Sequence, residues 1–392
     1  MKVLRAIKIR LRPTKEQEHL FWKSAGVARW AYNYYISEQE RVYTEWKNGK
    51  SEKKRIKETE IRKYINNTLK KTTHTWLSEV GSNVMKQSIK DADEAYKRFL
   101  KGISNRPKYK SKHRSTPSFY VNYESLRRTQ TGFRGEKIGF VKTTTPLPKL
   151  KENENYSNPR ITYDGDNWYL SVGYEFEPTV HELSDASIGI DLGIKTLAVC
   201  SDGNTFKNIN KTKRVRQLKK KLRREQRRYS RMFQENVESY DKLRRPIYKK
   251  PLYECKNLQK QAKKMRGLHR KLTNIRNNYS HQITNQIVKT KPSRIVMEDL
   301  NVKGMMKNRY LSKAVSEQRF YEFIRQMRYK CEWNGIQFVQ AHRSFPSSKM
   351  CSCCGNIKKD LKLSDRIYTC ICGNIMDRDY NASINLANYK LV

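Results

Sequence analysis

The N-terminal half of the chain shows two hydrophobic periods in succession. Apolar and basic residues alternate over residues 2–11, which predicts a β-strand that stops at Pro13. Apolar and aromatic positions recur every three to four residues over 15–45, and two further lysine-rich helical patterns follow within 51–101. We therefore expect a helical domain at residues 13–111.

Short alternating segments separated by turn signals follow between residues 118 and 177. They predict the strands of a small β-barrel of the OB type, to which the N-terminal strand returns. This expected β-barrel domain comprises residues 1–12 and 112–183.

The C-terminal half alternates short apolar strands with longer helical patterns. Strands are expected at 187–191, 196–202, 204–208, 293–300 and 336–343, and helices at 211–230, 255–289, 316–333 and near the C-terminus. Strands followed by helices indicate an α/β domain. We expect it at residues 184–345 and 375–392, with an insertion at 346–374.

The charge balance points to a polyanionic partner. Lys and Arg number 83 against 38 Asp and Glu, a formal net charge of +45. Residues 211–230 alone contain 11 Lys or Arg and one Glu. This imbalance favours contact with a polyanion over a helix face that is only solvated. We interpret the chain as a nucleic-acid-binding protein, with a ribosomal-type or chromatin-type binder as an open alternative.

The sequence predicts a cytoplasmic protein without a membrane partner. No apolar segment approaches the roughly 20 residues that cross a bilayer, and the N-terminal stretch carries charges among its apolar residues. In the cytosol the eight cysteines are not expected to form disulfides.

Five cysteines crowd into residues 351–372 and predict a metal site. Cys351 and Cys354 form one pair and Cys370 and Cys372 a second, each followed by glycine. Two turns that each supply two thiolates are typical of structural zinc, and four thiolates leave no open position for catalysis. Cys353 is a spare thiol that could replace a ligand of the first pair, and a cluster of reduced core cysteines is the remaining alternative.

Three acidic residues occupy positions that suit catalysis. Asp191 ends one apolar strand, Glu298 ends another, and Asp379 lies near the start of the last expected helix. Three converging carboxylates can hold two Mg²⁺ ions for phosphodiester cleavage. From the residues alone Asp299 competes with Glu298, and Asp377 and Asp379 are both possible helix caps.

These segments together resemble the TnpB family of transposon-encoded nucleases, relatives of the compact type V CRISPR effectors. The resemblance rests on GIDLGIKTLAV at 189–199, IVMEDLN at 295–301, the cysteine run through DRDYNASINL at 351–386, and KIRLRPTKEQEHLFWKSAGVARWAYN near the N-terminus. It implies a RuvC/RNase H-like nuclease domain with an inserted zinc ribbon, a REC-like helical domain and a WED-like β-barrel.

The same resemblance assigns roles by position. Asp191, Glu298 and Asp379 match the catalytic acids that bind Mg²⁺, which favours Glu298 over Asp299 and Asp379 over Asp377. Cys351, Cys354, Cys370 and Cys372 match the ligands of one structural Zn²⁺.

The implied function is an RNA-guided DNA endonuclease. It implies a guide RNA derived from the transposon end, and double-stranded target DNA cut beside a short recognition motif. Tyr, Trp and Arg within 21–45 and 106–123 are candidates for stacking or phosphate contacts, although more of them are expected in the core. The alternatives are a nuclease-inactive RNA-guided DNA-binding regulator and a general RNA-binding protein. A transposase with a catalytic tyrosine and a histidine pair is disfavoured, since no such histidine pair is found.

Overall fold

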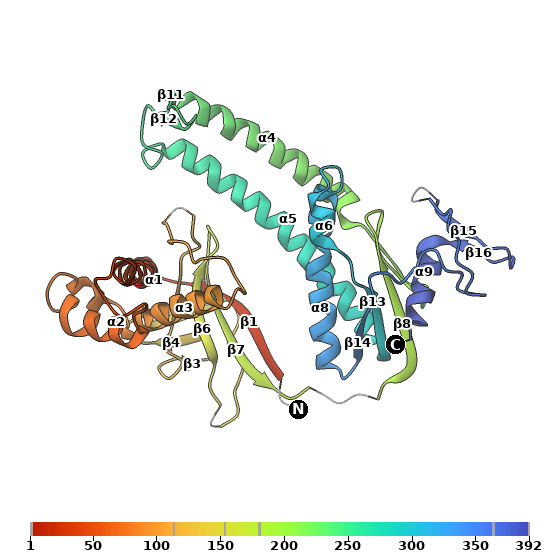
Figure 1. Cartoon of the computed structure of the whole chain (residues 1–392), viewed down its shortest axis with the longest axis horizontal. Coiled ribbons are helices and arrows are strands. Elements are labelled where there is room, and N and C mark those ends of the chain that lie inside the picture. The colour runs from red at the N-terminus through yellow and green to blue at the C-terminus, as the bar shows by residue number, and fades with distance from the viewer. Residues whose placement is uncertain (1–2, 113, 153, 179–181, 363–364, 391–392) are drawn as a thin grey trace. The chain divides into compact units, whose positions relative to one another are not determined.

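The computed structural model describes residues 3–112, 114–152, 154–178, 182–362 and 365–390 (Figure 1). The chain divides into two compact units, Lys2–Glu177 and Pro178–Val392, and each is described by itself. Parts of the expected domains, at 1–2, 113, 153, 179–181, 363–364 and 391–392, lie outside the described residues. Within the described residues no helix is long and apolar enough to cross a membrane.

The N-terminal unit contains the predicted helices. They are α1 (Lys15–Lys47), α2 (Glu58–Tyr64) and α3 (Ser82–Leu100), with a π-helical segment at Ile65–Leu69 and a 3₁₀ turn at Thr75–Glu79. Helix α1 begins where the sequence places it, because Thr14 accepts a hydrogen bond from the Gln17 backbone N–H and the Gln17 side chain accepts one from the Thr14 backbone N–H.

The strands of this unit form one antiparallel sheet. They are β1 (Val3–Arg12), β2 (Ser118–Tyr120), β3 (Arg127–Arg128), β4 (Gly132–Gly135), β5 (Gly139–Thr143), β6 (Ser157–Tyr163) and β7 (Trp168–Phe176). Their order is β2-β6-β7-β1-β5-β4-β3. Strand β1 pairs with β7 along Val3–Arg10 and with β5 at Leu11 and Arg12, so the N-terminal strand joins the sheet as expected.

The sheet order gives the strands of the expected barrel, whose closure stays a prediction. Strands β2 and β3 are the two ends of the order, and no pairing between them joins the ends within the described residues. The alternating pattern predicted the strands, but closure depends on which strands pair, and that is a long-range property.

The C-terminal unit is built on a mixed five-stranded sheet. Its strands are β8 (Ser184–Leu192), β9 (Thr196–Cys200), β10 (Thr205–Lys207), β13 (Pro292–Glu298) and β14 (Gln337–Ala341). The order is β10-β9-β8-β13-β14, with β8, β13 and β14 parallel and the other pairs antiparallel. The α/β class expected for this part of the chain is therefore confirmed.

Helices surround this sheet and one hairpin extends from it. The helices are α4 (Lys213–Glu235), α5 (Lys256–Lys289), α6 (Val302–Lys307), α7 (Ser312–Gln318), α8 (Phe320–Trp333) and α9 (Arg378–Ala387), with a 3₁₀ turn at Ile209–Lys211. Strands β11 (Val237–Tyr240) and β12 (Pro246–Tyr248) connect α4 to α5, and β15 (Ile367–Thr369) pairs with β16 (Ile375–Asp377). The single helix expected at 316–333 is broken at Arg319, whose backbone is left-handed with φ of 57°.

The two faces of the sheet bury different partners (Figure 1). One face packs Ile188, Ile190 and Met297 against α5 and α8. The other face packs Val296 against Leu386 of α9. Gly189 permits this contact, because a Cβ atom there would lie 1.9 Å from the Ser383 carbonyl oxygen. Helix α9 therefore lies directly on β8.

Candidate active site and metal centre

Strand alternation places Asp191 and Glu298 on the α9 face of the sheet. Asp191 follows Ile190, which faces α5 and α8, so its side chain belongs to the opposite face. Glu298 has the same parity as Val296, which packs against α9. Since Met297 is the register partner of Ile190 in parallel strands, Glu298 and Asp191 stand next to each other at the carboxyl ends of β13 and β8.

Asp379 comes to the same region from the first turn of α9. Asp377 is the N-cap of this helix, because its side chain accepts hydrogen bonds from the backbone N–H groups of Asp379 and Tyr380 at 2.9 and 3.1 Å. The suggestion that Asp379 caps the helix is therefore wrong. The Asp379 carboxylate does not accept the capping hydrogen bonds, and it lies 3.7 Å from the Arg378 guanidinium.

The electrostatics of Asp191 show that the three acids are neighbours. Burial raises the pKa of Asp191 well above its usual range, and the carboxylates of Glu298 and Asp379 raise it further, whereas Arg378 lowers it. A bound cation would stabilise the charged form of Asp191 against this burial and repulsion.

The three carboxyl groups are less tightly gathered than the cysteines. Of the described His, Cys, Asp and Glu residues, only the four cysteines discussed below bring their ligand atoms within 4.8 Å of one another. The three acids therefore share one region of the sheet without forming a tight ligand cluster like that of the cysteines.

Asp299 faces away from this group. Its carboxylate pairs with Arg343 at 2.6 Å, and both side chains are largely exposed. This partner explains the second acid of the Glu298-Asp299 pair without a catalytic role.

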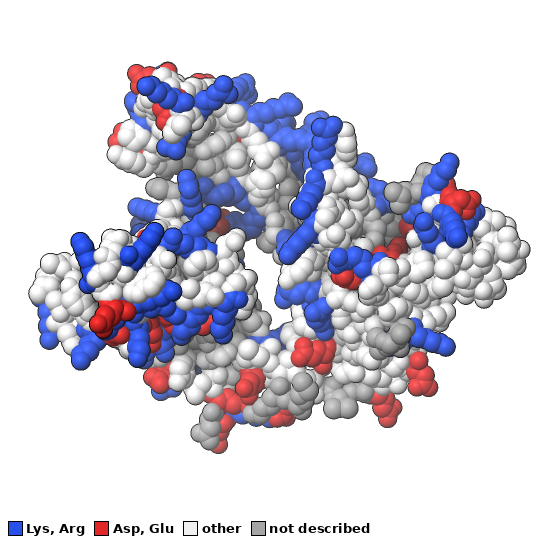
Figure 2. Space-filling view, in the orientation of Figure 1, with Lys and Arg blue, Asp and Glu red and all other residues white. Residues whose placement is uncertain are grey.

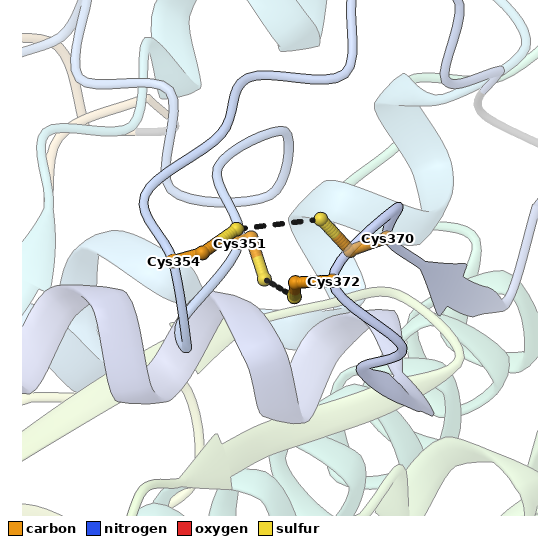
Figure 3. A group of neighbouring side chains, drawn as sticks. All are labelled: Cys351, Cys354, Cys370 and Cys372. Atoms are coloured by element: carbon orange, nitrogen blue, oxygen red, sulfur yellow. Dashed lines mark hydrogen bonds between the residues drawn. The ribbon is translucent and has the colours of Figure 1, made fainter.

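The four predicted zinc ligands converge (Figure 3). The Cys351 and Cys372 sulfurs are 3.7 Å apart, and those of Cys354 and Cys370 are 3.5 Å apart. Tetrahedral zinc with bonds of about 2.3 Å requires sulfurs about 3.8 Å apart. Cys353, the spare thiol, is exposed and is not part of the group.

The surroundings of Cys351 favour a thiolate. Burial alone would raise its pKa, but backbone N–H groups of Cys354 and Cys353 and the side chain of Asn374 lower it to about 6. Asn374 Nδ2 lies 3.4 Å from the Cys351 sulfur. Cys351 is thus suited to bind a cation as a thiolate, whereas the neighbouring thiols raise the pKa of Cys372 to about 12.

Two buried asparagines of α9 hold the first cysteine turn, and the sequence analysis did not single them out. Asn381 Nδ2 donates to the Met350 carbonyl at 2.7 Å, and the Ser352 backbone N–H donates to Asn381 Oδ1 at 2.9 Å. Asn385 Nδ2 donates to the carbonyls of Met350 and Ser347 at 2.6 and 2.7 Å. The available signal was two asparagines four residues apart, on one face of a short helix.

Ser347 was missed as well. It is 2% exposed, and its hydroxyl donates a hydrogen bond to Oε1 of Glu298. A single serine before a cysteine motif carries no periodic signal, so only the folded chain reveals this contact.

The hairpin of α4 and α5 is strongly basic. Helix α5 has nine Lys or Arg and no acidic residue, and α4 contains nearly all of the basic run predicted from sequence. Between the helices lies a groove of about 610 Å³, whose lining includes Arg214, Lys221 and Lys271. Figure 2 shows Lys and Arg spread over the visible face, with Asp and Glu in smaller groups. Such a groove suits a phosphate backbone.

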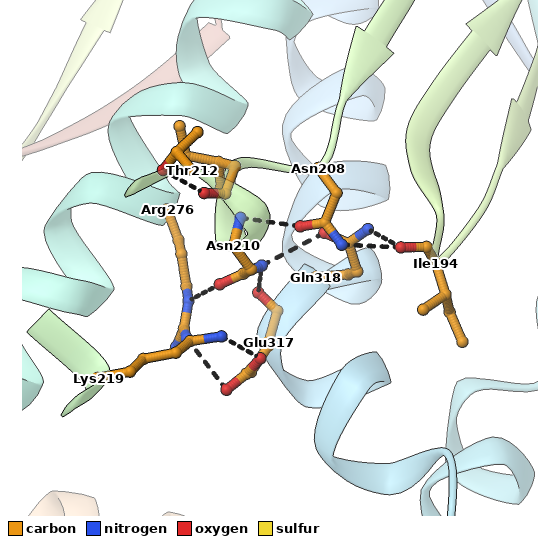
Figure 4. Close-up of polar contacts among 9 residues, drawn as sticks. Ile194, Asn208, Asn210, Thr212, Lys219, Arg276, Glu317 and Gln318 are labelled. Carbon is orange, nitrogen blue, oxygen red and sulfur yellow. Dashed lines mark hydrogen bonds and ion pairs between the residues drawn. The ribbon is translucent and has the colours of Figure 1, made fainter. Parts of the chain in front are cut away.

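A polar network fixes the base of this hairpin (Figure 4). Arg276 of α5 donates to Asn210 at 2.8 Å, and Glu317 of α7 pairs with Lys219 of α4 at 2.5 Å. Gln318 Nε2 donates to the carbonyl oxygens of Gly193 and Ile194, at 3.0 and 3.2 Å. The hairpin is thereby linked to the loop that follows Asp191.

The aromatic candidates of the N-terminal unit divide between core and surface. Phe21 and Tyr35 are fully buried, as expected for the majority. Trp22, Tyr43 and Tyr109 are 41%, 44% and 51% exposed and stay candidates for contact with bases.

Three family models match the chain in order. A helix-turn-helix domain model matches residues 1–50, a model described as a probable transposase matches 171–309, and a Cas12f1-like TNB domain model matches 320–386. The first and second are models of the OrfB proteins of IS605.

Similar proteins cover nearly the whole chain. A protein of Streptomyces pristinaespiralis, named as a candidate RNA-guided DNA endonuclease, is 28% identical over 98% of this chain and 89% of its own length. InsQ of Escherichia coli K12, named in the same way, is 26% identical over 98% of this chain and 91% of its own length.

A solved structure shows the same fold. The protein in the cryo-EM structure of a Cas12f1–sgRNA–target DNA complex superposes with a TM-score of 0.58 over 99% of both chains, at 12% identity. The chain is thus a mixed α/β protein with a fold similar to that of Cas12f1 and with a four-cysteine cluster. The family models and the two relatives confirm the resemblance to the TnpB family.

Proposed function

We propose that this chain is an RNA-guided DNA endonuclease whose nuclease site consists of Asp191, Glu298 and Asp379. The observation that carries the proposal is the meeting of these acids on one face of the sheet. Asp191 and Glu298 end adjacent parallel strands, and Asp379 comes from the helix that packs on that face. The names of the two full-length relatives support the activity.

The carboxylates would hold two Mg²⁺ ions. Hard oxygen ligands suit Mg²⁺, and a nearby divalent cation would stabilise the charged form of Asp191, whose pKa is raised by burial and by its acidic neighbours. When bound, such a pair supplies an activated water and stabilises the leaving oxygen. Cys351, Cys354, Cys370 and Cys372 would hold one structural Zn²⁺.

The chain itself contributes position and charge to this site. Because Asp377 caps α9, the Asp379 carboxylate stays available. Asp299, on the other face of the strand, forms an ion pair with Arg343. Arg378 lowers the pKa of Asp191 and lies 3.7 Å from the Asp379 carboxylate, so it adds a positive charge beside these acids.

The basic surface would hold the nucleic acids. A net charge of +45 suits a guide RNA and its duplex with target DNA, which proteins of this kind bind by shape and backbone rather than by sequence. The groove between α4 and α5 is one phosphate-binding surface. The helices and the sheet of residues 2–177 would act as REC-like and WED-like domains that bind the guide RNA and the motif beside the target.

Single substitutions of the acids test the proposal. Asp191→Ala, Glu298→Ala or Asp379→Ala in the guide-RNA complex should lower the cleavage rate of matched double-stranded DNA by at least about 10³-fold, while guide-RNA binding stays unchanged. Asp299→Ala is the matched control, because it removes the adjacent acid and should cut within about twofold of wild type.

The outcomes are distinct. Wild-type cleavage by any one of the three variants would remove that acid from the site. Wild-type protein that binds guide and target but never cuts would favour the nuclease-inactive regulator. Protein that binds RNA without guide-directed DNA binding would favour the general RNA-binding protein.

A further inference from the structure

Ser347 connects the cysteine cluster to the carboxylate of Glu298. It lies between β14 and Cys351, is 2% exposed, and donates its hydroxyl proton to Glu298 Oε1. Among the described residues this is the one hydrogen bond that the Glu298 carboxylate makes. One carboxylate oxygen therefore has a fixed partner and the other is left available.

Ser347 is itself held from two directions. Its carbonyl accepts a hydrogen bond from Asn385 of α9 at 2.7 Å, and Asn385 is 2% exposed. The turn that begins at Pro346 is closed by backbone N–H donation from Lys349 and Met350 to the Pro346 carbonyl at 2.9 Å. The residue after this turn is the predicted zinc ligand Cys351, so the backbone that carries the Ser347 hydroxyl is tied to the cysteine turn.

We propose that Ser347 is a positioning residue that sets the orientation of the Glu298 carboxylate for divalent-cation binding, and that the zinc-bound turn holds it in place. This inference rests on the function proposed above. A glutamate side chain has three rotatable bonds, and fixing one oxygen removes orientations that would direct the other away from a cation. Hydrogen-bond partners of metal-ligating carboxylates typically contribute a factor of about 10 to 100 to metal affinity.

The chain offers a matched control at the next position. Ser348 is partly buried, and its hydroxyl makes no hydrogen bond to a residue that the structure describes. Ser347→Ala and Ser348→Ala thus remove the same atom from neighbouring positions, but only the first should affect Glu298.

The test is a titration of the zinc-loaded full chain with Mn²⁺ by calorimetry, together with zinc content, thermal stability and the Mg²⁺ dependence of cleavage. Ser347→Ala should weaken Mn²⁺ binding about 10-fold and raise the Mg²⁺ concentration for half-maximal cleavage by a similar factor. Zinc content and melting temperature should match wild type, and Ser348→Ala should match wild type in all four measurements. Ser347→Thr, which keeps the hydroxyl, should recover at least part of the Mn²⁺ affinity.

Wild-type Mn²⁺ affinity in Ser347→Ala would overturn the inference. Loss of zinc or early melting of that variant would overturn it as well, because the hydroxyl would then serve folding rather than the carboxylate. Glu298→Gln separates the two proposals. If it binds Mn²⁺ as wild type does, the nuclease site is wrongly assigned. If Glu298→Gln loses Mn²⁺ binding and Ser347→Ala does not, only the role of Ser347 is wrong.

Discussion

Adjacent residues in this protein can have opposite surroundings because side chains alternate along a strand. Glu298 faces α9 and accepts a hydrogen bond from Ser347, whereas Asp299 pairs with the exposed Arg343. The two carboxylates therefore differ in surroundings although they are adjacent in sequence. Exchanging the two residues would keep a carboxylate on each face, but the one at position 298 would be one methylene shorter.

Lys330 of α8 is a buried cation with a measurable consequence for stability. It is 8% exposed, and its Nζ donates to the His281 carbonyl and to Thr284 Oγ1 at 2.9 and 2.8 Å. Burial lowers the pKa of Lys330 to about 8. The unfolded value is about 10.4, so between these pH values the unfolded chain binds more protons than the folded one. The free energy of unfolding should therefore rise with pH across this window, by at most about 1.4 kcal/mol per pH unit from this group.

Denaturant unfolding at pH 7.5, 9 and 10 of wild type and Lys330→Met measures this contribution as a difference. In Lys330→Met, the free energy of unfolding should rise less steeply with pH than in wild type, because the contribution of Lys330 is lost. Lys289→Met, which removes an exposed lysine at the end of α5, should keep it. Burial and the Lys330 charge lower the pKa of the neighbouring His281, which therefore titrates below the window. Parallel curves for wild type and Lys330→Met would contradict the prediction.

At the scale of elements, α9 combines three tasks in ten residues. Its first turn carries Asp379, its buried asparagines hold the first cysteine turn, and its last turns pack on β8. A displacement of this helix should therefore disturb the carboxylates and the cysteine turn together.

Gly189→Ala should displace α9. The added Cβ would lie 1.9 Å from the Ser383 carbonyl oxygen and 2.4 Å from the Ala387 nitrogen, both backbone atoms that cannot rotate away. We expect a loss of roughly 1–3 kcal/mol in the free energy of unfolding, and reduced cleavage, measured by denaturant unfolding and a cleavage assay. Gly267→Ala in α5 is the control, because open space surrounds Gly267 and alanine there should stabilise the helix by about 0.5–1 kcal/mol. Equal stability of the two variants would rule out the close contact.

The cysteine turn allows a similar comparison of neighbours. Cys354→Ser should reduce bound zinc below one equivalent and lower the melting temperature of the C-terminal unit, because Cys354 belongs to the cluster. Cys353→Ser should keep full zinc content, since Cys353 is exposed and outside the cluster. Elemental analysis measures the zinc content of both variants, and thermal melting measures their stability. Zinc loss in Cys353→Ser would show that the spare thiol replaces a ligand.

Elements with a strong hydrophobic periodicity could be predicted from the sequence, whereas features that depend on contacts between distant residues could not. The apolar spacing of α1 and the alternation of β7 placed both within a few residues, because local burial determines each pattern. The break at Arg319 was missed, since no glycine or proline marks it. The order of the strands in the N-terminal sheet could not be predicted either, because strand pairing is not encoded in any single strand.

The candidate site divides in the same way. The cysteine spacing predicted the ligand cluster, because four thiolates at two turns are a local motif. The identity of the acids came from the resemblance to TnpB. The face of the sheet on which each acid lies could be seen only in the structure. Ser347 and the α9 asparagines act through contacts at sequence distances of 29 to 49 residues, which no local pattern records.

At the scale of the whole molecule, charge is the dominant property. A net charge of +45 would oppose a compact fold, and bound polyanions would offset the repulsion. The logarithm of the association constant for the guide RNA should therefore fall linearly with the logarithm of the salt concentration.

Arg214→Gln, Lys221→Gln and Lys271→Gln together test whether the hairpin groove contributes to this binding, since these residues line it. If each neutralises one phosphate, the triple variant should reduce the log–log salt slope by about 2–3. Filter binding from 50 to 400 mM salt measures the slope, and thermal melting checks that the variant is folded. A slope identical to wild type would place the bound nucleic acid elsewhere.

The tip of the α4–α5 hairpin is far from the sheet along the chain and adds nothing to its pairing. Its turn, between β11 and β12, has Leu243 at 69% exposure, and the backbone there is closed by local bonds within Asp241–Arg245. An extra protein domain joined at Leu243 would enter and leave through a surface turn, without cutting a strand or a buried helix. The hairpin tip thus provides an internal attachment point for a fused effector, away from both chain ends.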